Sequence, residues 1–220
     1  MATATRPDTP RRPPACITGV GNAWPVPRAA EERGRYLGIA LKQTQRLQKQ
    51  IEQLFDYARL EANERKPQLE SFPILELLYD VVNKFRIRAE RQQVRLTVDA
   101  AAENLLVHAD IGLVESLLDN LIDNALQHTP AAGEVTLSAV SDGGLAMLSV
   151  ADSGSGIAPS QRRRVFDSFY RADDDSRSGE HAGLGLAIAK KIIELHGQSI
   201  EVGSSAAGGA EFRFTLQQAR

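Results

Sequence analysis

The chain has 220 residues, of which 42% are hydrophobic and 25% are charged, and its formal net charge is −2. This composition is typical of a soluble globular protein of one or two domains, and the small net charge argues against nucleic acid or an anionic membrane as a partner. No apolar run approaches the roughly 18 residues that a membrane-spanning helix needs. The single cysteine, Cys16, cannot form an internal disulfide, so we expect a reducing compartment, the cytoplasm.

The front of the chain predicts a leader and one long helix. Residues 1–30 are rich in Pro, Ala, Thr and Arg without a sustained period, so we expect a disordered or loosely attached leader. Residues 31–66 form the next segment, with a helix predicted from Glu31 to about Asn63. Its apolar residues recur at alternating intervals of three and four, which is typical of a heptad seam: Leu37, Leu41, Leu47, Ile51, Leu54 and Ala58. Such a seam requires a partner helix.

Residues 67–220 show a mixed pattern of strands and helices. Apolar alternation and short apolar runs predict strands over residues 69–72, 94–98, 105–107, 134–140, 145–151, 200–202 and 211–216. Apolar positions at helical spacing predict helices over residues 73–91, 110–128 and 183–196. Residues 158–182 have neither pattern and predict a long loop, which in a compact domain is typical of an active-site lid. The pattern indicates an α/β fold.

Two asparagines lie in the segment Asp119–Ala125 of a predicted helix. Asn120 and Asn124 are four residues apart, so they share one helix face. An amide oxygen is a hard, neutral ligand that suits Mg²⁺, an ion that also binds triphosphate oxygens. Asparagine is a poor helix former, so the pair favours a binding site, with two surface asparagines as the alternative.

An aspartate followed by two glycines ends a predicted strand in the segment Asp152–Ile157. A buried carboxylate can accept a hydrogen bond from the exocyclic amine of adenine, where guanine presents an acceptor instead. Gly154 and Gly156 would let the backbone approach the base and adopt unusual torsions. The alternative is a turn in which Asp152 is only a turn former.

Two further segments complete the series, Phe166–Arg171 and Gly183–Leu186. Gly183 and Gly185 precede a predicted helix, where bare backbone amides form a phosphate site; a plain helix start with two lid hinges is the alternative. Phe166 and Phe169 lie in the predicted loop, and we expect both to anchor it on the domain core.

In this order, the four segments resemble the N, G1, F and G2 boxes of the catalytic domain of sensor histidine kinases, over roughly residues 36–218. The resemblance implies the two-layer α/β sandwich of the GHKL or Bergerat ATPase fold, shared with gyrase, Hsp90 and MutL. A mixed sheet would pack on helices, after the long heptad helix. The resemblance also implies ATP and Mg²⁺ as the bound molecules.

The same resemblance implies roles for individual residues. Asn124 is the Mg²⁺ ligand, Asn120 lies near the phosphates, and Asp152 holds adenine. Arg171 reaches the γ-phosphate, so that Asn120, Asn124 and Arg171 form the catalytic set. The other nucleotide-binding residues that it implies are His128, Gly154, Gly156, Ile157, Gly183, Leu184, Gly185 and Leu186.

The histidines do not match the family's phosphoacceptor. None of the four, His108, His128, His181 and His196, lies early in a two-helix hairpin and precedes Glu or Asp and then Pro. His196 ends the last predicted helix, where a cation is favoured. Residues 36–63 resemble the second helix of the dimerisation and phosphotransfer hairpin, so we expect a chain that is truncated or degenerate at its front.

The resemblance implies a protein histidine kinase that transfers the γ-phosphoryl group of ATP to a histidine and then to a response regulator. Its expected partners are ATP, a response regulator, and a second copy or a related kinase bound through the 36–63 helix. Full-length relatives of this family are often membrane-anchored. The alternative is a non-catalytic regulatory or interaction module of the same fold that binds ATP. We do not expect this chain alone to phosphorylate itself.

Overall fold

The computed structural model describes residues 30–62, 66–100, 104–171 and 183–219. The predicted leader, up to residue 29, and the end of the predicted loop, residues 172–182, lie outside the described residues. The chain divides into two units, Met1–Gln43 and Thr44–Arg220. The described part of the first unit is the start of helix α1 (Ala30–Glu61), and the second unit holds the rest of α1 and all the other elements.

Helix α1 confirms the helix predicted from Glu31 to about Asn63, with its end two residues earlier. The predicted apolar seam is exposed, as expected for a heptad helix without a partner. The exposed fractions of its leucines and isoleucine range from 71% at Leu37 to 45% at Ile51. Near the end of α1 the pattern changes, because Leu60 is only 4% exposed and belongs to the hydrophobic core of the second unit.

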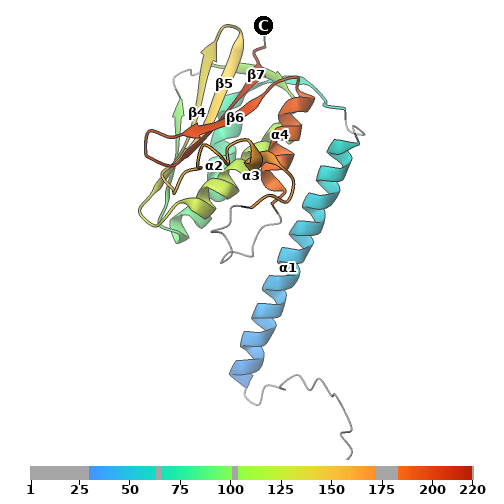
Figure 1. The fold of residues 1–220 in the computed structure, drawn as a ribbon, viewed down its shortest axis with the longest axis vertical. Coiled ribbons are helices and arrows are strands. Elements are labelled where there is room, and N and C mark those ends of the chain that lie inside the picture. Colours follow the sequence, from blue (N-terminus) through green and yellow to red (C-terminus); the bar gives the residue numbers. More distant parts are fainter. Residues whose placement is uncertain (1–29, 63–65, 101–103, 172–182, 220) are drawn as a thin grey trace, which may run out of the picture. The chain divides into compact units, whose positions relative to one another are not determined.

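Five strands form the main sheet (Figure 1), in the order β2 (Arg95–Ala100), β4 (Glu134–Asp142), β5 (Leu145–Asp152), β7 (Ala210–Gln217) and β6 (Ile200–Ser204). Strands β2 and β4 are parallel, and the other neighbours are antiparallel, so the sheet is mixed. A second, two-stranded sheet pairs β1 (Glu70–Pro73) with β3 (Leu106–Ala109).

The β4–β5 hairpin closes through a tighter turn than the four residues predicted for it. Its strands extend to Asp142 and from Leu145, which leaves Gly143 and Gly144 as the turn. Their φ angles are 57° and 88°. Two consecutive positive φ values define the turn that matches the twist of a two-residue hairpin, and glycine adopts them without steric cost.

Three helices cover one face of the main sheet: α2 (Ile74–Arg91), α3 (Ile111–His128) and α4 (Gly185–Leu195) (Figure 1). Along β5, buried residues alternate with partly exposed ones, as expected for a strand with one face against a core. Helix α3 lies at the centre of this core, with Leu117, Leu121 and Ile122 fully buried. The predicted two-layer α/β sandwich is therefore confirmed.

Asp110 joins three segments at the start of α3. Its Oδ1 accepts a hydrogen bond from the backbone N–H of Leu113 at 3.0 Å and caps the helix, while its Oδ2 accepts from the N–H of Gln68 at 2.9 Å. Its own N–H donates to Nε2 of His196 at 3.1 Å. A single buried residue thus connects three segments, with its side chain bonded to the segment after α1 and the start of α3 and its backbone N–H bonded to the end of α4.

The two ring nitrogens of His196 have different hydrogen-bond roles. Its Nε2 accepts a hydrogen bond, and its Nδ1 lies 2.8 Å from the carbonyl oxygen of Ile192, which can only accept. The proton therefore lies on Nδ1. The end of this helix favours a cation, but here Nε2 of the ring accepts from the backbone amide of Asp110.

We expect Asp110→Ala to lower the free energy of unfolding by about 1 to 3 kcal/mol, because it removes a helix cap and leaves the amide of Gln68 without its acceptor. Urea denaturation measures the change. Asp99→Ala, at an exposed site on β2, is the matched control and should stay within about 0.5 kcal/mol of the wild type. Equal effects of the two substitutions would contradict this role of Asp110.

Candidate functional site

A cavity lies where α3, the end of β5, the chain after it and the start of α4 meet. Ten of the twelve residues predicted to form the site line it: Asn120, Asn124, His128, Asp152, Gly156, Ile157, Arg171, Gly183, Gly185 and Leu186. These residues come from four segments that are far apart in the sequence, and the fold brings them to one place.

The other two predicted residues lie just behind the cavity wall. Leu184 is 1% exposed, and its side chain belongs to the core below the start of α4. Gly154 packs on the end of α3, since a Cβ atom there would lie 2.4 Å from the carbonyl oxygen of His128. Two backbone segments therefore approach closely at Gly154, which leaves no room for a side chain. The unusual torsion predicted for the two glycines occurs at Gly156, with a φ of 69°.

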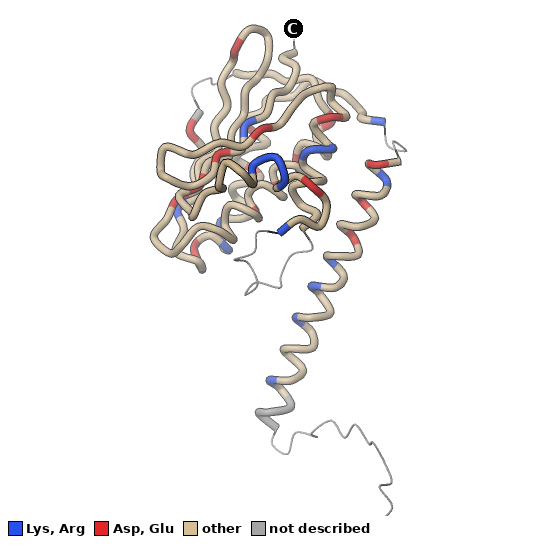
Figure 2. Tube along the Cα trace, in the orientation of Figure 1, with Lys and Arg blue, Asp and Glu red and all other residues tan. Residues whose placement is uncertain are grey.

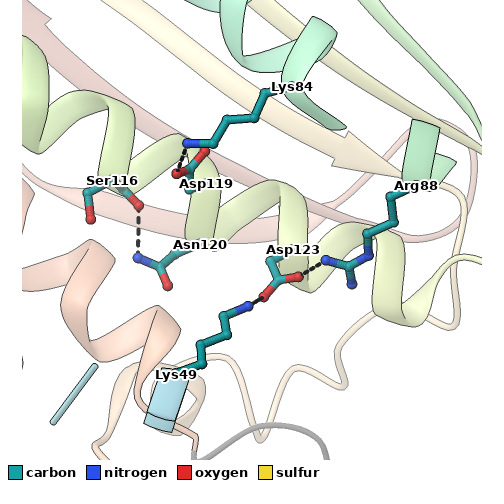
Figure 3. A network of polar contacts seen from close by, with 7 residues as sticks. All are labelled: Lys49, Lys84, Arg88, Ser116, Asp119, Asn120 and Asp123. Atoms are coloured by element: carbon teal, nitrogen blue, oxygen red, sulfur yellow. Dashed lines mark hydrogen bonds and ion pairs between the residues drawn. The ribbon is translucent and has the colours of Figure 1, made fainter. Parts of the chain in front are cut away.

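Helix α3 presents one polar edge to the cavity and buries the opposite side. Asn120, Asn124 and His128 recur every four residues and line the cavity, as their spacing predicts. Nδ2 of Asn120 donates to the carbonyl oxygen of Ser116 at 2.8 Å (Figure 3), which fixes the orientation of the amide. Its Oδ1 would lie 3.0 Å from a Cβ atom on Gly185, so the first residue of α4 has little room for a side chain.

Asp152 ends β5 with its carboxylate at the cavity, although the residue is only 3% exposed. One oxygen, Oδ1, accepts the backbone N–H groups of Gly154 at 2.8 Å and Ala210 at 3.1 Å. No hydrogen bond from the described residues reaches Oδ2. Burial raises the pKa of Asp152 above its ordinary value, and the two amides offset this only in part. The side chain is therefore an acceptor whose second oxygen is available at the cavity.

The chain between β5 and α4 forms the outer wall of the cavity. Within the predicted loop, the short 3₁₀ helix η1 (Arg164–Phe166) ends with a side chain that packs edge-on against Phe212, with ring centroids 6.0 Å apart. Phe169 is 61% exposed. The prediction that both aromatic residues anchor this segment is thus confirmed for Phe166 and wrong for Phe169.

Three consecutive arginines mark the same wall, visible as the blue turn in Figure 2. Arg162 donates to the carbonyl oxygen of Ile157 at 3.3 Å and to Oγ of Ser204 at 2.7 Å, which ties the wall to strand β6. The guanidinium of Arg164 lies 4.7 Å from the ring centroid of Tyr170, which also lines the cavity. The contacts of Arg162 hold the wall against β6, and the contact of Arg164 joins η1 to the end of the same wall.

An ion-pair cluster centred on Asp123, which also lines the cavity, was not predicted from the sequence. Asp123 is 7% exposed; its Oδ2 accepts from Nζ of Lys49 on α1 at 2.7 Å, and its Oδ1 accepts from Arg88 on α2 (Figure 3). Burial alone would raise the pKa of Asp123, but the hydrogen bonds and charges of Lys49 and Arg88 outweigh it and hold that pKa below its ordinary value. An acidic residue between the apolar Ile122 and the cavity residue Asn124 was the signal that a cation is needed there.

The pKa of Asp119, four residues earlier on α3, is shifted in the opposite direction. Its Oδ2 accepts from Nζ of Lys84 at 2.6 Å, while its Oδ1 is buried without a hydrogen-bond partner among the described residues. Burial raises the pKa of Asp119, and the hydrogen bond and charge of Lys84, whose side chain is half exposed, offset this only in part. Helix α3 therefore carries two carboxylates whose pKa values are shifted in opposite directions.

Residues 109–220 match the model of the family described as histidine kinase-, DNA gyrase B-, and HSP90-like ATPase. The chain belongs to this family of ATPases, and the relatives that resemble it are sensor histidine kinases, as the four boxes predicted. The sensor-like histidine kinase SenX3 of Mycolicibacterium smegmatis is 31% identical over 84% of this chain and 48% of its own length. The sensor protein SrrB of Staphylococcus aureus is 33% identical over 82% of this chain and 31% of its own length. The chain thus spans half or less of the length of these two relatives.

Solved structures give the same result. Full-length ShkA in complex with AMPPNP is 31% identical, has a TM-score of 0.76, and aligns over 88% of this chain and 41% of its own. The mycobacterial sensor histidine kinase MprB is 27% identical, with a TM-score of 0.61, over 68% of this chain and 98% of its own. No helix among the residues described in our structure is both long and apolar enough to cross a membrane.

We expect Asp123→Asn and Asp119→Asn to change stability with opposite dependence on pH. The folded pKa of Asp123 is below its ordinary value of 3.8, so its contribution is present above pH 3.8 and is lost as the pH falls through the folded pKa. The folded pKa of Asp119 is raised, so its contribution is present below 3.8 and is lost as the pH rises.

Denaturant unfolding at several pH values between about 7 and 2.5 measures both effects. At neutral pH, Asp123→Asn should lower the free energy of unfolding by about 1 kcal/mol or somewhat more, because the exposed parts of Lys49 and Arg88 are screened by solvent. This deficit should shrink in acid, whereas Asp119→Asn should become less stable relative to the wild type as the pH falls. Parallel pH profiles for the two variants would contradict the assigned shifts.

Proposed function

We propose that this chain is the ATP-binding catalytic part of a two-component sensor histidine kinase. Residues 67–220 are then the catalytic domain, and residues 31–66 are one helix of the dimerisation and phosphotransfer hairpin. The observation that carries the proposal is the buried carboxylate of Asp152, which has one oxygen fixed by two backbone amides and the other available at the cavity. We place the protein in the cytoplasm.

Adenine recognition follows from the direction of hydrogen bonding at Asp152. An ionised carboxylate only accepts, and the exocyclic amine of adenine is a donor, whereas guanine presents an oxygen at the same position. The cavity also contains apolar side chains, Ile157, Val165 and Leu186, beside which a purine ring can lie. The similar protein ShkA has been solved with AMPPNP, an ATP analogue, and this supports the same ligand here.

Mg²⁺ fits the donor groups on the phosphate side of the cavity. The described residues contain no group of three His, Cys, Asp or Glu side chains that could hold a metal ion without other ligands. We propose the amide oxygen of Asn124 as the protein ligand, as the resemblance implies, because Asn124 lines the cavity and Mg²⁺ takes most of its ligands from water and the nucleotide phosphates in such sites. When bound, the ion neutralises phosphate charge.

The residues around the phosphates orient the nucleotide and neutralise its charge. We propose that Asn120 and His128 contact phosphate oxygens from α3, and that the backbone of residues 183–186 contributes amides at the start of α4. Arg171 lines the cavity from the opposite wall and supplies a positive charge near the γ-phosphate. The phosphoryl acceptor is a histidine on a dimerisation hairpin, and the final acceptor is an aspartate of a response regulator.

The exposed seam of α1 is the proposed site of association with a second copy of the chain or with a related kinase. Its apolar residues have exposed fractions of 45% or more among Leu37, Leu41, Leu47, Ile51 and Leu54. A stripe of this kind at heptad spacing is buried when two or more helices pack together.

Asp152→Ala should weaken ATP binding by about 5- to 150-fold, because loss of a buried hydrogen-bond partner costs about 1 to 3 kcal/mol. Titration with a fluorescent ATP analogue, in competition with ATP and GTP, measures affinity and selectivity. Asp167→Ala removes an exposed carboxylate from the cavity wall without touching the cavity lining, so it should bind like the wild type. Unchanged affinity in Asp152→Ala would exclude its role in adenine binding.

Asn124→Ala should abolish most of the increase in ATP affinity that Mg²⁺ gives the wild type, because the substitution removes the one protein oxygen assigned to the ion. Isothermal titration with ATP in the presence of Mg²⁺ or EDTA measures this increase. Asn83→Ala, an exposed site on α2, controls for loss of an asparagine from a helix. If Asn124→Ala responds to Mg²⁺ as the wild type does, the metal has other ligands.

The chain alone should not form phosphohistidine. The three described histidines are placed in the catalytic domain: His108 beside Ser71 on the small sheet, His128 in the cavity, and His196 against Asp110. Incubation with labelled ATP, followed by tests of acid and alkali stability, measures the product. Adding a separate histidine-bearing hairpin from a related kinase should restore labelling, on the hairpin. Acid-labile label on the chain alone would contradict the prediction, and no label with any hairpin would favour the non-catalytic module.

A further inference from the structure

The turn between β6 and β7 holds the backbone of Asp152 from behind. Oγ of Ser205 donates to the backbone carbonyl oxygen of Asp152 at 2.5 Å and accepts from the N–H of Gly209 at 3.0 Å. Ser205 is 8% exposed and does not line the cavity. This hydroxyl therefore connects two buried backbone groups, one of which belongs to the residue assigned to adenine.

The same turn also fixes the carboxylate of Asp152. The N–H of Ala210, the residue after Gly209, donates to Oδ1 at 3.1 Å. A Cβ atom on Gly209 would lie 2.3 Å from both the backbone oxygen and Oδ1 of Asp152, so only glycine fits at this position. If the β6–β7 turn shifted, the amide of Ala210 and the backbone of Gly209 would therefore move together, and both contact the carboxylate of Asp152.

Hydrogen bonds within the turn hold the hydroxyl of Ser205 in place. The N–H of Ser205 donates to the carbonyl oxygen of Gly209 at 2.9 Å, and the N–H of Gly208 donates to the carbonyl oxygen of Ser205 at 3.1 Å. The neighbouring hydroxyl, on Ser204, faces the other way and accepts from Arg162 at 2.7 Å. Two adjacent serines therefore have separate functions, one toward Asp152 and one toward the cavity wall.

We propose that Ser205 is a positioning residue for base recognition. It holds the β6–β7 turn against Asp152, so that the amide of Ala210 keeps Oδ1 fixed and Oδ2 directed to the amine of adenine. The proposal rests on the proposed function, since it assigns Asp152 to adenine. Ser205 acts only through Asp152 and does not touch the nucleotide. Its removal should therefore affect the hydrogen bond to the amine more than the binding of the purine ring or the phosphates.

Two nucleotides separate this role from a general effect on the fold. ATP carries the 6-amino group, and purine riboside 5′-triphosphate has a hydrogen in its place. We expect Ser205→Ala to bind ATP about 5- to 10-fold more weakly than the wild type, the size of one lost hydrogen bond, and to bind the purine analogue with less than a 2-fold change. Ser141→Ala, at an exposed site on β4 away from the cavity lining, is the control and should keep both affinities. Isothermal titration measures the six affinities, two for each protein, and thermal unfolding reports whether the variants are folded.

A drop in the ratio of ATP affinity to analogue affinity, restricted to Ser205→Ala, supports the proposal. An unchanged ratio, or a parallel loss of both affinities, overturns it while leaving the role of Asp152 intact. If the wild type itself shows no preference for ATP over the analogue, the assignment of Asp152 to adenine is wrong, and the role of Ser205 is excluded with it. Should Ser205→Ala not fold, Ser205→Cys keeps the size of the side chain, weakens its hydrogen bonds, and gives the same comparison.

Discussion

A carboxylate buried at the end of a strand must find hydrogen-bond donors, and this requirement organises the site. Asp152 is only 3% exposed, and its Oδ1 is satisfied by two backbone amides, one from the following turn and one from β7. Through Oδ1, Asp152 is therefore bonded to Ala210, a residue 58 positions later in the chain. Since these bonds are made to Oδ1, Oδ2 stays available to a ligand, and the raised pKa of Asp152 reflects how little water reaches the group.

Helix α3 connects this acceptor to the rest of the molecule. Its apolar side forms the centre of the core, while its polar edge supplies cavity residues at every turn. Between the two lies Asp123, which binds cations from two other helices, Lys49 on α1 and Arg88 on α2. The cavity also includes Gln53, one turn after Lys49 on α1. The long helix therefore contributes both charge and surface beside the site assigned to phosphate.

The sequence predicted the elements whose signals are local. The limits of α3 follow from the capping side chain of Asp110 and from apolar spacing, and the β4–β5 hairpin follows from Gly143 and Gly144. The four boxes also predicted ten of the residues that line the cavity. These features depend on neighbours within a few residues in the chain.

Contacts between distant segments could not be predicted in this way. The ion pair between Lys49 and Asp123 joins residues 74 positions apart, and the hydrogen bond from Ser205 to Asp152 joins residues 53 apart. Neither a lysine on a polar helix nor a serine in a glycine-rich turn has a local pattern that reveals its partner. The prediction for Phe169 was wrong for the same reason. Tertiary contacts determine the path of its loop, and this path decides whether the aromatic side chain is buried.

A crystal structure of the chain with AMPPNP and Mg²⁺ tests the central claim most directly. We predict the exocyclic amine of adenine within hydrogen-bond distance of Oδ2 of Asp152, about 2.7 to 3.2 Å, with Oδ1 still bound to the amides of Gly154 and Ala210. The phosphates should lie between Asn124 and the start of α4. A nucleotide bound with its base away from Asp152, or a carboxylate released from both amides, would contradict the assignment of this buried acceptor to adenine.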